Sequence, residues 1–123
     1  MEFIEAPAFT RQLSKYLDDD EYRTLQAELA ANPELGDLMP GTGGFRKIRW
    51  ADARRGMGRR CGLRIIYYYF KSDCQIWLMT AYDKDEASDL TAKEKKALRT
   101  AIESELAARA ARRVRPSRSR RTW

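Results

Sequence analysis

The chain of 123 residues contains no histidine. Histidine is the commonest general base near neutral pH, and the Ser-His-Asp and Cys-His nucleophile systems depend on it. A catalytic site in this protein must therefore work with lysine, arginine, tyrosine and carboxylates. A zinc site of nitrogen and sulfur ligands cannot be assembled either, because only Cys61 and Cys74 could contribute and they lie thirteen positions apart. We expect no metal and no cofactor.

Long apolar runs are also missing. No segment approaches the roughly 20 apolar residues that a membrane span needs, and the N-terminal MEFIEAPAF lacks the regions of a signal peptide. We therefore expect a cytoplasmic protein without membrane contact. Both cysteines should be reduced in that compartment, although a disulfide between them stays open if neighbouring strands bring them together.

A phosphate-binding loop is absent as well. The run Gly41-Thr42-Gly43-Gly44 lacks the Lys-Ser/Thr that would follow, and it leads into a predicted strand where such a loop would open a helix. These glycines are expected to form a tight turn.

Positive charge is concentrated in one segment. Residues 46–64 hold eight cations and one acid, a net charge of +7, whereas residues 1–45 hold three cations and nine acids. Cations gathered on one part of a chain are expected where a polyanion binds. A solvated loop is the simpler explanation, but two predicted strands frame this segment and place its cations on defined faces.

The hydrophobic pattern predicts a strand, two helices, three strands and a final helix. We expect strands at 2–5, 45–50, 63–70 and 75–82. Two helices should follow the first strand, separated near residues 17–20, and the second should end at 32–33. The last helix should begin at the capping box at 91–94. Alternation along residues 45–50 places Ile48 and Trp50 on one face and Lys47 and Arg49 on the other.

The composition changes after Ala108. The last fifteen residues hold seven arginines and no acid, and so account for more than the whole net charge of +6. Such a segment cannot bury a core and is expected to be disordered or to fold only on binding. We therefore predict a domain at 1–108 and an arginine-rich tail at 109–123, which is either a solubilising extension or an RNA contact.

Several segments in this order resemble the HigB branch of the RelE/ParE toxin superfamily of type II toxin-antitoxin systems. They are NPELGD at 32–37, GTGGFRKIR at 41–49, RIIYY at 64–68 and YDKDE at 82–86, and the resemblance covers roughly residues 1–105. It implies an α+β, RelE-like compact domain: a four-stranded, largely antiparallel sheet packed against two N-terminal helices, plus a C-terminal helix. The activity implied is metal-free, ribosome-dependent cleavage of messenger RNA.

The resemblance also implies the catalytic residues. Lys47 and Arg49 match the paired strand cations of RelE-type ribonucleases, Arg64 matches the arginine of the next strand, and Lys84 lies near a basic position that follows the last strand. We assign Lys47 as candidate base, Arg49 and Arg64 as clamps on the phosphate and transition state, and Lys84 as candidate acid or further clamp. Surface charge between two aspartates is the simpler explanation of Lys84.

RNA contacts are expected from neighbouring residues. RelE has a functional tyrosine just past its last strand, and the matching place here is near Thr91. Tyr68, Tyr82 or neither therefore stacks on a base. Tyr67 and Tyr69 are expected in the core, because only Tyr68 shares the face of Arg64. Cations expected to grip the RNA backbone are Arg46, Arg54, Arg55, Arg59 and Arg60.

Two other functions stay open from sequence. One is a ParE-like poison of DNA gyrase without nuclease activity, which the same fold can support. The other is a non-catalytic RNA-binding module, in which lysine and arginine would be interchangeable. For either toxin, the resemblance implies a cognate HigA-like helix-turn-helix antitoxin, with operator DNA bound only through the toxin-antitoxin complex.

Overall fold

The computed structural model describes residues 1–50, 63–83 and 90–119, with side chains described as far as Arg113. The chain forms two compact units. The first comprises residues 1–39 and 44–89, and the second comprises residues 40–43 and 90–123. The predicted division into a domain at 1–108 and a tail at 109–123 stays a prediction.

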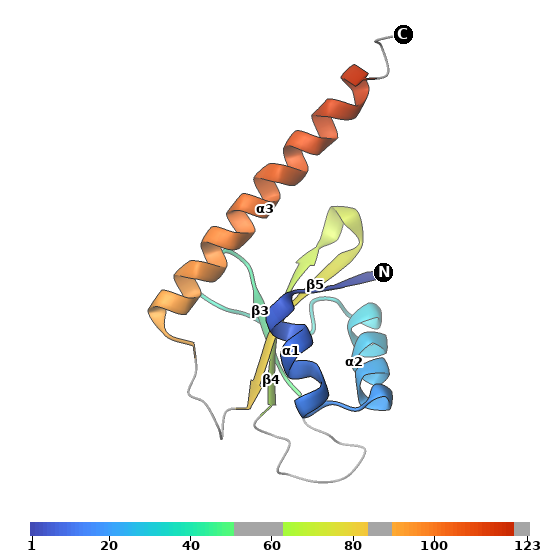
Figure 1. Cartoon of the computed structure of the whole chain (residues 1–123), viewed down its shortest axis with the longest axis vertical. Coiled ribbons are helices and arrows are strands. Elements are labelled where there is room, and N and C mark those ends of the chain that lie inside the picture. The colour runs from blue at the N-terminus through green and yellow to red at the C-terminus, as the bar shows by residue number, and fades with distance from the viewer. Residues whose placement is uncertain (51–62, 84–89, 120–123) are drawn as a thin grey trace. The chain divides into compact units, whose positions relative to one another are not determined.

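The first unit is built on a five-stranded sheet in the order β1-β5-β4-β3-β2 (Figure 1). Its strands are β1 (Glu2–Glu5), β2 (Asp37–Leu38), β3 (Arg46–Arg49), β4 (Leu63–Phe70) and β5 (Gln75–Asp83). The pairings are antiparallel except for β1 with β5, which is parallel. The sequence predicted four strands. It missed β2, whose two residues are too few to show alternation.

Two helices follow β1 in this unit. Helix α1 (Pro7–Tyr16) begins with a proline, whose missing N–H group costs nothing in the first turn. Helix α2 (Asp19–Ala31) begins with a capping box, in which Asp18 accepts from the Glu21 N–H at 2.7 Å and the Glu21 carboxylate accepts from the Asp18 N–H at 2.8 Å. The predicted break between the helices is confirmed.

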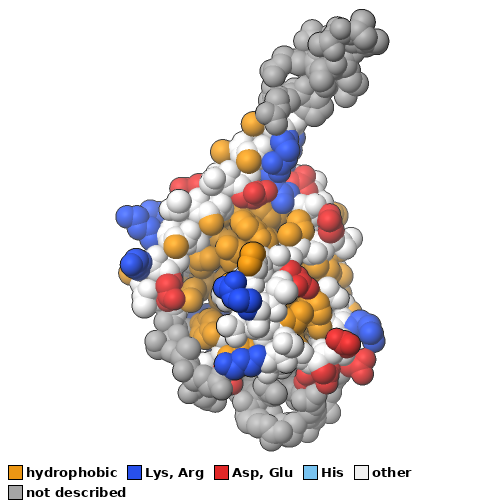
Figure 2. All heavy atoms as spheres, viewed as in Figure 1, with side chains coloured by type: hydrophobic (Ala, Val, Ile, Leu, Met, Phe, Trp, Pro, Cys, Tyr) orange, Lys and Arg blue, Asp and Glu red, His pale blue; other side chains and the backbone are white. Residues whose placement is uncertain are grey.

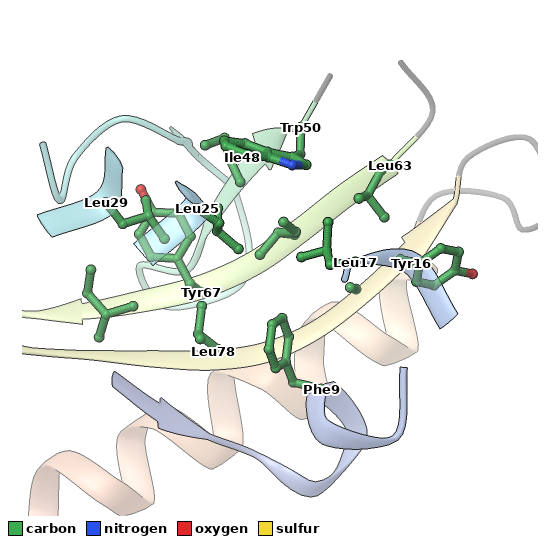
Figure 3. Packing of buried hydrophobic residues seen from close by; sticks show 13 residues of the cluster. Phe9, Tyr16, Leu17, Leu25, Leu29, Ile48, Trp50, Leu63, Tyr67 and Leu78 are labelled. Carbon is green, nitrogen blue, oxygen red and sulfur yellow. The ribbon is translucent and has the colours of Figure 1, made fainter. Parts of the chain in front are cut away.

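The core of the unit lies between these helices and one face of the sheet (Figure 3). Leu25 and Leu29 of α2 are fully buried near Tyr67 of β4, and Phe9 of α1 lies near Leu78 of β5. The other buried members of the cluster are Tyr16, Leu17, Ile48, Trp50, Leu63, Ile65, Ile76 and Ala81. On β3 and β4 this face consists of alternate residues, as strand geometry requires.

The hydroxyl of Tyr67 fastens the loop after α2 to this core. Tyr67 is fully buried, its hydroxyl accepts from the Gly36 N–H at 2.8 Å, and it donates to the Pro33 carbonyl at 2.9 Å. Burial raises the pKa of this hydroxyl above its ordinary value. The predicted core position of Tyr67 is confirmed, and Tyr69 packs partly buried against the same cluster.

The second unit contains helix α3 (Ala92–Ser119) and the turn at 40–43. The predicted capping box is present, because the Glu94 N–H donates to Thr91 Oγ1 at 3.1 Å and the Thr91 N–H donates to Glu94 Oε1 at 2.8 Å. A Cβ on Gly43 would lie 2.9 Å from the buried Ile102, so the turn packs closely on α3.

Helix α3 continues eleven residues past Ala108, into the segment that we expected to be disordered or to fold only on binding. Alanine and arginine are both good helix formers, and an ion pair of 2.8 Å between Glu105 and Arg109 bridges the expected boundary. Among the residues that the structure describes, no helix has the length and apolar character needed to span a membrane.

We predict that Tyr67→Phe lowers the free energy of unfolding by about 2 kcal/mol, because the buried Gly36 N–H loses its acceptor. Tyr69→Phe is the matched control, since Tyr69 lies at the edge of the same cluster, and a change within about 0.5 kcal/mol is expected. Chemical denaturation measures both values. Equal losses in the two variants would contradict the anchoring role.

The same variant should respond differently to alkaline pH. The pKa of Tyr67 is raised in the folded state, so its stabilising contribution is complete below the unfolded pKa of about 10 and is lost as the pH rises through the folded pKa. Stability of the parent protein should therefore fall more steeply above about pH 10 than stability of Tyr67→Phe.

Candidate functional site

The second face of the sheet carries the candidate catalytic cations. In the pairing of β3 with β4, Lys47 lies opposite Ile66 and Arg49 lies opposite Arg64. Directly opposed residues in a sheet project to the same side. Lys47, Arg49 and Arg64 therefore share one face, away from Ile48 and the core. The predicted alternation is confirmed.

The two arginines occupy directly opposed positions at a closely spaced point of the ladder. The Trp50 N–H donates to the Leu63 carbonyl at 2.9 Å, which makes the neighbouring pair of Arg49 and Arg64 a non-hydrogen-bonded one. Opposed Cα atoms in such pairs are only about 4.5 Å apart, and like charges at opposed positions destabilise a sheet. An anion that binds between the two guanidinium groups would remove this repulsion and stabilise the pair.

The three cations differ in exposure. Arg49 is exposed, Lys47 is half-buried, and Arg64 has only 6% of its surface exposed. The Arg64 Nη1 donates to the carbonyl of the preceding Leu63 at 3.4 Å. Burial restricts the Arg64 side chain and strips it of water, and both effects strengthen its interaction with an anion that reaches it.

Strand β5 completes this face of the sheet. Tyr82 lies opposite Arg64, and Thr80 lies opposite Ile66. The register then shifts at Met79, the extra residue of a β-bulge, so that Trp77 lies opposite Tyr68. One row across the sheet thus contains Arg49, Arg64 and Tyr82, which places the predicted Tyr82 beside the predicted arginines.

Aromatic rings surround the other predicted tyrosine, Tyr68. Its ring lies 5.4 Å from Phe45 in an edge-on contact and 4.7 Å from Phe70, measured between centroids, and Phe70 stacks on Trp77 at 6.0 Å. Phe45 and Phe70 are buried, whereas Tyr68 and Trp77 are partly exposed. The contacts hold Tyr68 in place beside the cations. Sequence reasoning missed Trp77. Pairing the two strands residue by residue outward from the predicted turn at 71–73 would have placed it opposite Tyr68.

Gly44 allows the backbone to approach Tyr68 closely. Its φ is +117°, and a Cβ at this position would lie 3.0 Å from the Tyr68 ring. Glycine adopts positive φ without steric cost, whereas other residues are strained there. The glycine-rich segment thus forms a turn, as expected, and it also makes room for a ring of the candidate site.

Arg46 lies on the opposite face from the candidate site. It is opposed by the core residue Tyr67, and its Nη1 donates to the Gly36 carbonyl at 2.7 Å and to the Glu34 carbonyl at 3.2 Å. Its guanidinium also lies 3.9 Å from the Glu34 carboxylate. This placement gives Arg46 a role in holding the loop, and its contact with RNA stays a prediction. The sequence already indicated this face, because Arg46 lies two positions before Ile48 and alternate residues of a strand share a face.

A cavity of about 390 Å³ opens beside β3. The N–H of Trp50 points toward β4, and the N–H groups of successive residues in a strand point in opposite directions. The backbone of Arg49 therefore faces the other side of β3, where β2 has already ended and the cavity lies. The basic residues Lys47 and Arg49 and the acidic residues Glu28 and Asp37 are among those that line it. Its lining residues are Glu28, Leu35, Gly36, Asp37, Lys47, Ile48, Arg49 and Trp50.

The remaining predicted site residues lie outside the described residues. They are Arg54, Arg55, Arg59, Arg60 and Lys84. Cys61 lies outside them as well, so its pairing with the exposed Cys74 stays open. Within the residues that the structure describes, no group of three or more cysteine, aspartate or glutamate side chains is arranged to hold a metal ion.

Comparison with known proteins identifies the fold. No protein-family model matches the chain. A variant of Escherichia coli toxin RelE with two arginines replaced by alanine, solved in the free state, aligns with 80% of this chain and 95% of its own, at 11% identity and a TM-score of 0.54. A crystal structure of the isolated E. coli RelE toxin covers 89% and 97%, at 15% identity and a TM-score of 0.45. The first of these likenesses shows that the chain has a RelE-like α+β fold.

We predict that Gly44→Ala destabilises the protein more than Gly41→Ala. Both glycines have positive φ, but a Cβ on Gly41 meets nothing within 4 Å, whereas one on Gly44 would press on Tyr68. Backbone strain alone should cost about 1 to 3 kcal/mol. Thermal unfolding in a Tyr68→Ala background isolates the contact, because the extra cost of Gly44→Ala should shrink there. An unchanged cost would show that the ring does not set the requirement for glycine.

Proposed function

We propose that this protein is the toxin of a type II toxin-antitoxin pair and that it cleaves messenger RNA in the ribosomal decoding site without a metal ion. The observation that carries the proposal is the row formed by Arg49, Arg64 and Tyr82, with Lys47 on the same face. The RelE-like fold supports it, because the fold is that of a protein described as a toxin. Fold alone does not imply the activity.

The proposed reaction uses Lys47, Arg49 and Arg64 of this face, together with Lys84, which directly follows β5 in the sequence. The ribose 2′-hydroxyl attacks the adjacent phosphorus, the P–O5′ bond breaks, and a 2′,3′-cyclic phosphate remains. Lys47 is the base that accepts the proton of the 2′-hydroxyl. The guanidinium groups of Arg49 and Arg64 stabilise the charge that develops on the phosphorane. Lys84 then donates a proton to the departing 5′-oxygen.

Recognition of the RNA is assigned to the aromatic and basic neighbours of these cations. Tyr68 is held by ring contacts to Phe45 and Phe70 while keeping part of its surface exposed, which suits a platform for stacking a base. Tyr82 is the second candidate, next to Arg64. Arg54, Arg55, Arg59 and Arg60 are proposed to contact the RNA backbone.

A cognate antitoxin of the HigA-like helix-turn-helix type is the proposed protein partner, and operator DNA would be bound only by the complex of the two. A short repressor-like reading frame beside the gene would support this assignment. A DNA gyrase poison would require the same kind of partner but no RNA cleavage. Detection of a 2′,3′-cyclic phosphate on cleaved messenger RNA therefore separates the two functions.

We predict that Arg64→Ala reduces messenger RNA cleavage on ribosomes by about 100-fold to 1,000-fold, because a donor to the transition state is lost. Arg11→Ala, which removes an exposed cation from α1, should leave the rate unchanged. Growth arrest, cleavage and thermal unfolding are measured on the same preparations. Arg64→Lys serves as a second variant if alanine at this buried position unfolds the protein.

The outcome for Arg64 distinguishes catalysis from structural support. A stable Arg64→Ala protein that cuts at nearly the parent rate would contradict the proposed site. Early melting of both Arg64 variants, with normal cleavage by the fraction that stays folded, would show that Arg64 braces the sheet instead. A stable parent protein that never cuts messenger RNA would favour the gyrase poison.

We predict that Lys47→Arg also loses at least about 100-fold in cleavage, although the charge is kept, because guanidinium does not deprotonate at neutral pH and cannot act as a base. Lys71→Arg is the control, since Lys71 is exposed in the turn between β4 and β5. Binding of RNA should be nearly equal in the two variants. Unimpaired cleavage by Lys47→Arg would remove Lys47 from the role of base.

A further inference from the structure

The cavity beside β3 has no part in the proposed reaction, although it borders the candidate catalytic cations. Its volume of about 390 Å³ is in the size range of small-molecule sites in proteins. Lys47 and Arg49 line it, and the same two residues belong to the proposed catalytic face. A ligand in the cavity would therefore lie next to a phosphate bound at that face.

The charged residues of the cavity come from different elements according to their sign. The cations Lys47 and Arg49 belong to β3, whereas the acids Glu28 and Asp37 belong to α2 and β2. Figure 2 shows further acidic side chains in red over α2. Both lining acids are exposed, and among the residues that the structure describes neither carboxylate makes a hydrogen bond or an ion pair. Their oxygens are therefore available to hydrogen-bond donors of a ligand.

The backbone of Arg49 adds one donor and one acceptor to the cavity. Its N–H and C=O groups face the side of β3 on which the cavity lies, because β2 pairs with Arg46 and Lys47 and ends before it reaches Arg49. Within the described part of the chain, neither group has a hydrogen-bond partner. A donor beside an acceptor can pair with the edge of a nucleobase, which presents the same two kinds of group.

Apolar side chains of the cavity supply surface for a planar ring. Leu35, Ile48 and Trp50 are among the lining residues, and Figure 3 shows Ile48 and Trp50 next to each other at one margin of the core cluster. Leu35 keeps 41% of its surface exposed, so part of this apolar surface is not covered by the protein. A flat ring that covers it would be stabilised by the burial of apolar area.

These features together fit a nucleotide better than a peptide. A nucleotide carries negative charge at its phosphate, and adenine, cytosine and guanine carry donors at an amino group. Such a ligand matches cations on β3 and carboxylates on α2 and β2. A peptide added to the sheet edge needs unpaired backbone groups over several residues, whereas β2 already pairs with Arg46 and Lys47.

We propose that this cavity binds one base of the RNA substrate and selects bases that carry an exocyclic amino group over uracil. The proposal rests on the proposed function, because that function identifies RNA as the ligand. Glu28 and Asp37 supply acceptors for the amino group, the backbone of Arg49 pairs with the base edge, and Leu35 and Trp50 contact the ring. Uracil presents a carbonyl oxygen where cytosine presents its amino group, so the carboxylates would face an acceptor and disfavour it.

The test titrates the full-length protein with cytidine monophosphate and with uridine monophosphate. The two nucleotides share the sugar, the phosphate and the size of the ring, and they differ in the amino or carbonyl group that the carboxylates would contact. Backbone amide NMR signals of Gly36 and Arg49, which line the cavity, report whether the nucleotide binds there. The titrations need no ribosome and no cleavage.

Two variants lose equal charge at different places. One carries Glu28→Gln and Asp37→Asn. The matched control carries Asp19→Asn and Glu103→Gln, which replace two exposed acids outside the cavity lining. The ratio of the two nucleotide affinities is the quantity compared, because the loss of two negative charges changes the affinity for any anion.

We expect the parent to bind cytidine monophosphate about tenfold more tightly than uridine monophosphate, as for one hydrogen bond to a charged group. This ratio should fall below about threefold in the cavity variant, because a side-chain amide also offers a donor to uracil, and it should stay near the parent value in the control. Equal affinity of the parent for the two nucleotides would overturn the proposal. An unchanged ratio in the cavity variant would overturn it as well.

The outcomes separate this proposal from the proposed function. A parent protein that discriminates between the nucleotides but never cleaves messenger RNA would refute the ribonuclease and leave the nucleotide site in place. A parent that cleaves messenger RNA but binds both nucleotides equally would refute the cavity assignment alone. Signals of Gly36 and Arg49 that shift with the protein encoded by the neighbouring reading frame, and with neither nucleotide, would reassign the cavity to the protein partner.

Discussion

The register between β3 and β4 is the constraint on which the site depends. Ile48 opposes Ile65 on the core side, and Arg49 opposes Arg64 on the other. Because side chains alternate along a strand, a slip of one residue would turn every side chain of β3 to the wrong face. Burial of Ile48 and Trp50 therefore holds the cations in place. Burial of these side chains offsets the repulsion between Arg49 and Arg64.

A bulge in β5 keeps the core residues of this strand on one face and the site residues on the other. Ile76 and Leu78 belong to the core cluster, and so does Ala81, which lies three positions rather than two after Leu78. The extra residue, Met79, restores the alternation after the shift in register. If Met79 instead took a regular paired position in the ladder, Ala81 and Tyr82 would exchange faces. Tyr82 would then point into the core, and Arg64 would lose its neighbour across the sheet.

Two adjacent tyrosines of β4, Tyr67 and Tyr68, lie on opposite faces of the sheet and have different roles. Tyr67 holds the loop at 33–36 with its buried hydroxyl, and Arg46 binds the carbonyls of the same loop from the next strand. Tyr68 projects the other way into the aromatic group. The loop in turn borders the cavity beside β3. Core packing, loop position and candidate site thus depend on one short stretch of two paired strands.

Much of this arrangement could be predicted from local patterns. The strand at 2–5, the strand at 63–70 and the capping box at 91–94 match the predictions, because alternation, turn residues and caps involve residues close in sequence. The two-residue β2 escaped prediction, since so short a segment carries no periodicity. Helix α3 runs past Ala108 although that segment buries no predicted core, because alanine and arginine favour helix on their own.

By itself, the sequence determined which residues alternate, where the positive charge gathers and that histidine takes no part. These properties follow from composition and from the period of two along a strand. Only the tertiary structure decided that Arg49 lies directly opposite Arg64, that Tyr82 joins their row and that Arg46 serves the loop. Cross-strand register is set by packing and hydrogen bonds between segments far apart in the chain, and no local pattern contains it.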